Sequence, residues 1–170
     1  MDFKSFIRDV EDFPNPGINF KDITPLLQNP VALAAAAEAL HEFVLPNHID
    51  KVIGMESRGF ILGPLLATKL GAGFVPVRKK GKLPWNTVAE AYSLEYGSDV
   101  LEIHTDAIKK GERVLIHDDV LATGGTALAV CKLVERLGGT VVQCNFLIEL
   151  GSLKGADNLK GIPIKALLKY

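Results

Sequence analysis

The chain has 170 residues, of which 48% are hydrophobic and 23% charged, so its composition excludes disordered and fibrous proteins. A chain of this length buries about 69% of the surface that it exposes when unfolded, which suits one compact domain over residues 1–170. Its 19 Lys and Arg residues against 20 Asp and Glu give a net charge of −1. This balance excludes a basic surface for nucleic acid and leaves local charge clusters for any anionic ligand.

The cysteines and the apolar runs indicate where the protein works. Cys131 and Cys144 lie in apolar segments and are too few for a disulfide framework, which is typical of a reducing compartment. The first nine residues contain acids where a signal peptide needs an apolar core. The longest alanine-rich run, 31–37, is too short to span a membrane. We therefore expect a soluble cytoplasmic protein that does not interact with membranes.

Hydrophobic periodicity predicts the elements in chain order. A short helix is expected over 3–10, and a second helix begins at Asn29 and Pro30 and ends at Pro46. Two strand–helix–strand units follow, with the predicted bounds 51–55, 60–70 and 74–77 for the first and 114–116, 127–137 and 141–150 for the second. Such units predict an α/β fold with a parallel sheet and a ligand site at the carboxyl ends of its strands.

A segment of different character separates the two units. Residues 88–95 and 99–104 have the pattern of two strands joined at Tyr96, Gly97 and Ser98, which predicts a β-hairpin. A hairpin inserted between the units of an α/β sheet is a candidate lid, and its predicted extent is about 86–104.

Residues 114–126 carry the clearest chemical signal. An apolar strand leads to Asp118 and Asp119 and then to a small-residue loop, predicted over 118–126, that opens a helix. Backbone N–H groups, threonine hydroxyls and a helix N-terminus there suit a phosphate monoester. Two like charges roughly 4 Å apart repel by about 4 kcal/mol at an effective dielectric of about 20, so the aspartates cannot point at that phosphate. They are expected to accept hydrogen bonds from sugar hydroxyls or to help hold a metal, which together predicts a phosphorylated ribose.

Two other phosphate-binding motifs do not match the sequence. A dinucleotide fingerprint that begins at Gly71 would need a third glycine at position 76, which is Pro76. A Walker loop ending at Lys82 would need Ser or Thr next, and position 83 is Leu83.

The segment 118–126 resembles the phosphoribosyl pyrophosphate (PRPP) motif of the type I phosphoribosyltransferases. Four further segments resemble the adenine phosphoribosyltransferase family in the same order, namely 13–25, 56–60, 77–84 and 92–97. The resemblance runs from Phe13 to the C-terminus. It implies a type I phosphoribosyltransferase fold, with a parallel core sheet flanked by helices and a flexible β-hairpin hood. It also implies the reaction of adenine with PRPP to give AMP and pyrophosphate.

The resemblance assigns PRPP contacts to three groups of residues. The 5′-phosphate is assigned to Ala122, Thr123, Gly124, Gly125 and Thr126, and the ribose hydroxyls to Asp118 and Asp119. The pyrophosphate is assigned to Glu56, Ser57, Arg58, Arg78, Lys79 and Lys82. Mg²⁺ is implied as the metal, carried mainly by PRPP near the two aspartates and without a direct protein ligand. In the family the Arg-Lys dipeptide tends to reach the neighbouring subunit's site, which implies a homodimer.

The same resemblance implies the catalytic and base-binding residues. Glu95 matches the general acid/base that handles the proton on purine N9, and the adjacent Tyr96 helps to close the lid. Residues 1–25 are expected to contribute to base binding. Adenine contacts are assigned to Asn19, Phe20, Lys21, Arg58 and Leu121.

Three positions depart from the family pattern. Asn19 stands where an aliphatic residue is usual, and Lys21 replaces an arginine, so a point charge takes the place of a bidentate fork. His117 replaces the usual Val or Ile before the aspartates. Strand alternation favours a packing or hydrogen-bonding role for this histidine over a catalytic one.

Two alternatives remain open at this point. A 6-oxopurine or xanthine phosphoribosyltransferase would read its base with a C-terminal lysine or aromatic segment, and the tail contains Lys160, Lys165 and Lys169. The N-terminal adenine-type segment argues against that enzyme. A non-catalytic PRPP-sensing regulator would need a helix-turn-helix domain or a basic face, and neither is evident in the sequence.

Overall fold

The computed structural model describes residues 1–45, 48–93 and 98–170. The chain divides into two compact units, Met1–Ala39 and Leu40–Tyr170, and the division falls within helix α2 (Pro30–Glu42). The expectation of one domain over residues 1–170 stays a prediction. Among the described residues, no helix is long and apolar enough to cross a membrane.

The first unit contains a small antiparallel sheet followed by helices. Its elements are η1 (Phe3–Phe6), β1 (Arg8–Val10), β2 (Phe20–Asp22), α1 (Thr24–Gln28) and most of α2. The helix predicted over 3–10 is wrong, because one 3-10 turn gives way to β1, which pairs with β2 in antiparallel register. The start predicted for α2 is confirmed: Asn29 Oδ1 accepts hydrogen bonds from the N–H groups of Val31 and Ala32, both at 3.0 Å.

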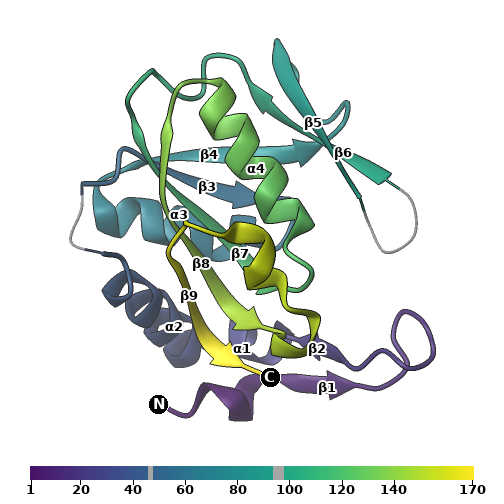
Figure 1. Cartoon of the computed structure of the whole chain (residues 1–170). Helices are drawn as coiled ribbons and strands as arrows, with labels where there is room; N and C mark the ends of the chain where they lie inside the picture. The colour runs from purple at the N-terminus through teal and green to yellow at the C-terminus, as the bar shows by residue number, and fades with distance from the viewer. Residues whose placement is uncertain (46–47, 94–97) are drawn as a thin grey trace. The chain divides into compact units, whose positions relative to one another are not determined.

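The second unit is built on a seven-stranded sheet (Figure 1) with the order β5-β6-β4-β3-β7-β8-β9. The strands are β3 (Lys51–Met55), β4 (Gly73–Lys79), β5 (Thr87–Ser93), β6 (Ser98–His104), β7 (Arg113–Leu121), β8 (Thr140–Glu149) and β9 (Ile164–Lys169). Neighbours from β4 through β3, β7 and β8 to β9 pair in parallel. The predicted α/β fold with a parallel core sheet is therefore confirmed.

The inserted segment forms an antiparallel hairpin at one edge of this sheet. β5 and β6 pair from Thr87 opposite His104 to Ser93 opposite Ser98, and β6 pairs with the end of β4. The predicted catalytic Glu95 and lid Tyr96 lie outside the described residues.

Two helices cover opposite faces of the sheet, with α4 (Gly125–Arg136) in front and α3 (Gly59–Leu70) behind in Figure 1. The backbone of β3 shows why α3 fits so closely. A Cβ on Gly54 would lie 2.7 Å from the Phe74 ring and 2.8 Å from the Gly59 carbonyl oxygen, so glycine is required at this approach. The alternate β3 residue Ile53 instead joins the core cluster that includes α4 residues such as Val130.

Two features of the sheet differ from the sequence prediction. β7 runs to Leu121, so the aspartates predicted in a loop over 118–126 are strand residues, and the loop contains only 122–124. β9 was not predicted, because lysines interrupt its apolar alternation. Pairing with β8 stabilises residues 164–169 as a strand, although their local sequence pattern does not favour one.

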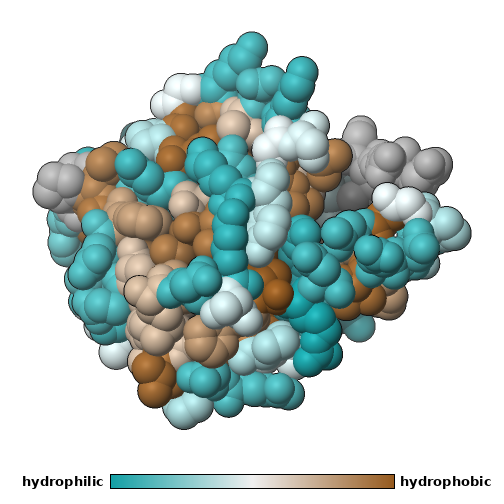
Figure 2. Space-filling model, turned by 90° about the horizontal axis from the view of Figure 1, so that it is seen from below, coloured by the Kyte–Doolittle hydropathy of each residue, from teal (hydrophilic) through white to brown (hydrophobic). Residues whose placement is uncertain are grey.

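Apolar side chains also reach the surface, where brown hydrophobic residues alternate with teal hydrophilic ones on the face shown in Figure 2. Trp85 is 66% exposed, and Ile61 and Leu65, one turn apart on α3, are 37% and 41% exposed. Single exposed apolar side chains of this kind are normal in folded proteins.

Candidate active site

The loop between β7 and α4 has the backbone of an anion-binding site. Gly124 adopts φ 80° and ψ −5°, the left-handed conformation that glycine reaches without steric cost. Its carbonyl oxygen accepts the first helical hydrogen bond, from the N–H of Leu128 at 2.9 Å. Within the described part of the chain, no side chain caps this helix start. The N–H groups of the first turn, including those of Gly125 and Thr126, are therefore oriented toward an anion placed at the helix end.

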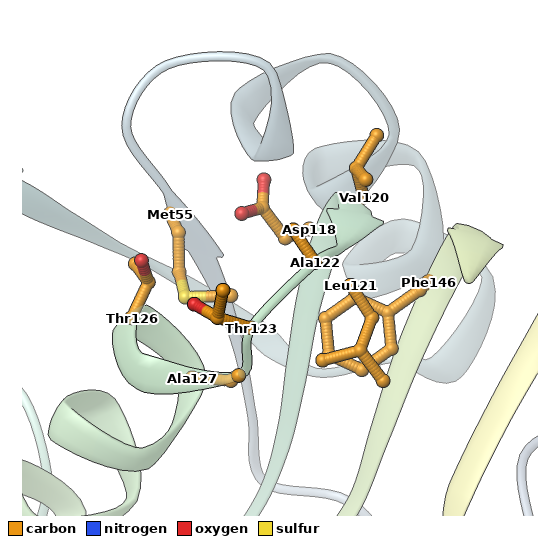
Figure 3. A pocket seen from close by; sticks show the side chains of 10 residues that line it. Met55, Asp118, Val120, Leu121, Ala122, Thr123, Thr126, Ala127 and Phe146 are labelled. Carbon is orange, nitrogen blue, oxygen red and sulfur yellow. The ribbon is translucent and has the colours of Figure 1, made fainter. Parts of the chain in front are cut away.

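A pocket opens beside this loop (Figure 3) and encloses about 290 Å³, including the solvent at its mouth. The residues that line it are Met55, Asp118, Val120, Leu121, Ala122, Thr123, Gly124, Thr126, Ala127 and Phe146. Six of these were predicted as PRPP or adenine contacts. The pocket therefore brings together the ends of β3 and β7 and the start of α4, which is the edge where parallel sheets bind ligands.

Asp118 and Asp119 are neighbours on β7, and their carboxyl groups lie close enough to interact with each other. Asp118 lines the pocket, and its carboxylate projects into the space shown in Figure 3. Asp119 is 4% exposed, is not among the described lining residues, and forms an ion pair with Arg58, with Nε 2.8 Å from Oδ2. The contact is an ion pair rather than an aligned hydrogen bond. The two carboxylates thus interact with each other but differ in their other contacts, although the sequence suggested a matched pair.

Burial dominates the titration of both aspartates. It raises the pKa of Asp118 well above the ordinary value, and the neighbouring charge of Asp119 raises it further. Burial also raises the pKa of Asp119, while the Arg58 guanidinium opposes that increase. Asp118 is therefore the carboxyl group that gains most from a cation or a hydroxyl donor entering the pocket.

Glu56 contacts Arg78 and Lys79, the basic dipeptide at the end of β4. Its carboxylate accepts hydrogen bonds from Nε and Nη2 of Arg78, both at 3.2 Å, and from the N–H of Lys79 at 2.9 Å. Burial raises the pKa of Glu56, but the Lys79 N–H and the Arg78 guanidinium outweigh it and hold that pKa below its ordinary value. The Arg78 guanidinium also lies 6.0 Å from the Phe60 ring centroid. Glu56 therefore fixes the orientation of Arg78.

Lys79 connects β4 with the hairpin. Its Nζ lies 3.0 Å from Asp99 Oδ2 on β6, and the Tyr92 hydroxyl donates to the same carboxylate oxygen at 3.4 Å. Burial raises the pKa of Tyr92, and the nearby Thr126 side chain opposes that increase. The hairpin therefore contacts Lys79 through Asp99 and lies beside the first turn of α4 through Tyr92.

The remaining predicted pyrophosphate residues occupy turns. Ser57 lies between β3 and α3, where its carbonyl oxygen accepts from the Phe60 N–H at 3.1 Å. Lys82 follows β4, and its carbonyl oxygen accepts from Arg78 Nη1 at 3.2 Å.

The predicted base-binding residues divide between the two units. In the first unit, Phe20 packs edge-to-face on Phe13 with ring centroids 5.2 Å apart, and Lys21 forms an ion pair with Asp9. Asn19 directly precedes β2. In the second unit, Leu121 is 1% exposed and lines the pocket with Phe146.

Met55 and Phe146 were not predicted as pocket residues. Met55 is the last residue of β3 and lies at the same strand edge as the aspartates, so the carboxyl-end rule could have found it. Phe146 lies within β8, opposite Asp118 in the parallel register, and no local pattern marks it.

His117 is fully buried on β7, opposite Asn145 of β8. Burial lowers the pKa of His117 to about 4, so the ring is neutral at physiological pH. This supports the packing role expected from strand alternation.

Substituting His117 with valine is expected to flatten the pH dependence of stability. The unfolded chain binds a proton near pH 6.5 and the folded chain only near pH 4, so the histidine destabilises the fold as pH falls through this window. Between pH 7.5 and pH 5 we expect the wild type to lose about 2 kcal/mol more than His117→Val. Urea unfolding at both pH values measures the difference, and equal losses in the two proteins would contradict it.

Comparison with known proteins places this geometry in a family. Residues 22–160 match the phosphoribosyl transferase domain. An adenine phosphoribosyltransferase from Christiangramia forsetii is 59% identical over 170 residues, covering 100% of this chain and 99% of the relative.

Solved structures agree with the sequence comparison. Adenine phosphoribosyltransferase from Rhodothermus marinus is 60% identical with a TM-score of 0.94, over 99% of this chain and 96% of that one. The Saccharomyces cerevisiae enzyme, in complex with an imino-altritol bisphosphate and adenine, is 43% identical with a TM-score of 0.91, over 96% and 94% of the two chains. The chain belongs to the adenine phosphoribosyltransferase family.

Proposed function

We propose that the pocket at the start of α4 binds the phosphoribosyl group of PRPP and that the side chains around it divide the work of transfer. The chain is a pentosyltransferase: it transfers the 5-phosphoribosyl group of PRPP to N9 of adenine and forms AMP and pyrophosphate. The observation that carries the assignment is the left-handed Gly124 loop beside Asp118 in one pocket. A phosphorylated ribose needs N–H donors for its phosphate next to a carboxylate that accepts from its hydroxyl groups.

The 5′-phosphate is assigned to residues 122–126, which form the loop and the start of α4. The left-handed glycine lets the backbone approach the phosphate oxygens, and the helix start supplies N–H groups and a positive dipole. Thr123 and Thr126 line the pocket and add hydroxyl donors. Asp118 faces the ribose hydroxyls, whereas Asp119 acts through Arg58, whose guanidinium it anchors at 2.8 Å.

The pyrophosphate is assigned to Ser57, Arg58, Arg78, Lys79 and Lys82. Departure of pyrophosphate concentrates negative charge, and preorganised cations stabilise that charge in the transition state. Glu56, expected among the PRPP residues, acts through Arg78, which it holds by two hydrogen bonds. A carboxylate in direct contact with pyrophosphate would instead oppose binding.

Mg²⁺ fits this site as a partner of PRPP. Among residues 1–45, 48–93 and 98–170, no three His, Cys, Asp or Glu side chains form a metal-binding group. Mg²⁺ commonly uses one or two carboxylates together with substrate oxygens and water, and Asp118 offers a half-buried carboxyl in the pocket. When bound, the metal neutralises the charge of the leaving pyrophosphate.

Glu95 is proposed as the general base. As the bond between C1′ and pyrophosphate oxygen breaks and the bond between C1′ and N9 forms, the N9 proton passes to the Glu95 carboxylate. The hairpin β5–β6 is assigned as the hood that excludes water, and Glu95 and Tyr96 fall between its two strands in the sequence. Adenine is assigned to Asn19, Phe20, Lys21, Arg58 and Leu121.

Two features support a homodimer in the cytoplasm. Ile61 and Leu65 present adjacent half-exposed apolar side chains on α3, which suits a contact between two copies. Cys131 and Cys144 are free and buried, as is typical of reducing compartments.

The base that reacts tests the proposed function. The chain incubated with PRPP, Mg²⁺ and each purine in turn is expected to turn over adenine at least about 100-fold faster than hypoxanthine or guanine, because a site built for an amino group leaves its polar groups unpaired with an oxo group. Release of pyrophosphate and formation of nucleotide are the two measurements. Equal or faster turnover of a 6-oxopurine would favour the alternative enzyme. The alternative enzyme would bind its base with a residue of the C-terminal tail such as Lys169. In this structure Nζ of Lys169 lies 2.9 Å from Oε2 of Glu149 and so forms an ion pair within the protein.

Glu95→Gln is expected to lower kcat by about 100-fold and to change the Kd of PRPP less than about threefold. The amide cannot accept the N9 proton but keeps the size of the side chain. Steady-state kinetics and calorimetric titration with PRPP separate the two effects. An unchanged kcat would remove Glu95 from the mechanism.

A further inference from the structure

The phosphate loop is backed by a second segment that the sequence did not single out. This segment is the 3-10 helix η3 (Gly155–Leu159), which lies near the C-terminus and packs against α4. At its far end Leu159 is 2% exposed and belongs to the core cluster, so η3 is anchored in the body of the unit.

The backbones of the loop and of η3 meet without room for a side chain. A Cβ on Gly155 would lie 2.2 Å from the Ala122 carbonyl oxygen and 3.0 Å from the Gly124 nitrogen. In the opposite direction, a Cβ on Gly124 would lie 2.3 Å from the Gly155 carbonyl oxygen. Real Cβ atoms do not approach backbone this closely, so both positions require glycine.

Asn158 adds one directional contact to this packing. Its Nδ2 donates to the Thr123 carbonyl oxygen at 2.7 Å. In a planar trans peptide the C=O and the following N–H point in opposite directions, so this bond turns the Gly124 N–H away from Asn158. Gly124 lines the pocket, whereas Asn158 is not among the described lining residues.

We propose that η3 backs the phosphate loop and that Asn158 is a positioning residue, which keeps the Thr123–Gly124 peptide with its N–H available to the 5′-phosphate. This inference rests on the proposed assignment of residues 122–126 to that phosphate. If the peptide flipped, a carbonyl oxygen would replace an N–H donor and repel the anion. Asn158 is exposed and touches the far side of the loop, so it acts on ligand affinity through Thr123.

The test compares ligands with and without a 5′-phosphate. Asn158→Ala is expected to raise the Kd of AMP and of ribose 5-phosphate about tenfold and to change the Kd of pyrophosphate less than twofold. Asn158→Asp, which matches the shape but cannot donate, is expected to have at least the same effect. Ser152→Ala, a neutral exposed position in the preceding 3-10 helix η2 (Gly151–Leu153), is the matched control and should bind all three ligands like the wild type.

A second variant distinguishes the positioning role of Asn158 from the assignment of residues 122–126 to the 5′-phosphate. Thr126→Ala, measured in parallel, should weaken AMP binding if the loop holds the 5′-phosphate. Weaker AMP binding in Thr126→Ala with unchanged binding in Asn158→Ala would overturn the positioning role alone. Unchanged binding in both variants would overturn both statements. Equal weakening of AMP and pyrophosphate in Asn158→Ala, with a lower melting temperature, would indicate a general structural role and also overturn the inference.

Discussion

Gly124→Ala is expected to lower kcat/KM for PRPP by at least about 100-fold, because a shift of about 1 Å in a substrate-binding loop can cost this much. The added Cβ would lie 2.3 Å from the Gly155 carbonyl oxygen, so the loop or η3 must move. The left-handed conformation, at φ 80°, adds roughly 1–2 kcal/mol of strain for any residue with a side chain. Steady-state kinetics with varied PRPP measures the loss.

Gly111→Ala is a control that adds backbone strain at a left-handed residue without displacing a neighbouring segment. Gly111 has φ +87°, and the described structure leaves open space within 4 Å of the position where its Cβ would lie. This variant should lose roughly 1 kcal/mol of unfolding free energy and keep the wild-type kcat/KM. Wild-type kinetics in Gly124→Ala, or an equal loss in both variants, would contradict a loop held by close backbone packing.

Glu56→Ala is expected to lower kcat by about 10- to 100-fold and to weaken pyrophosphate binding by a similar factor. The carboxylate accepts two hydrogen bonds from Arg78 and one from the Lys79 N–H, and bonds to charged groups contribute about 1.5–3 kcal/mol each. Without these hydrogen bonds the Arg78 side chain is not held in place before pyrophosphate binds. Binding must then restrict its rotation, which lowers the affinity. Pre-steady-state turnover and calorimetric titration with pyrophosphate test both effects.

Glu112→Ala is the matched control for this prediction. Glu112 also accepts from a backbone N–H, that of Lys109 at 2.8 Å, and lies 3.7 Å from Lys51, but it precedes β7 at the opposite end of the strand. It should reduce stability without changing pyrophosphate affinity. The double variant Glu56→Ala with Arg78→Ala should be little worse than Arg78→Ala alone. Fully additive losses would show that Glu56 acts independently of Arg78.

The local sequence determined the main elements and the chemical class of the ligand. Strand-to-helix changes in hydrophobic period marked both βαβ units, and an ordered run of aspartates, threonines and glycines marked a phosphorylated sugar. These signals are local, because a helix start and a tight loop depend on neighbouring residues. The loop from Ala122 to Gly124 is therefore readable before any tertiary contact is known.

Tertiary structure decided how those residues are used. Pairing with β8 extends β7 to Leu121, and Asp118 of this extension lines the pocket while Asp119 contacts Arg58. Strand pairing likewise replaces the helix expected over 3–10 and creates β9 from a lysine-containing tail.

The supporting contacts of the site also depend on distant segments. Glu56 meets Arg78 across 22 positions, and Asn158 meets Thr123 across 35. No periodicity records such contacts, because they form when the sheet aligns strand ends that are far apart in the chain. The sequence by itself therefore determined the fold class and the reaction, and only the tertiary structure decided which side chains contact the pocket and which hold those side chains in place.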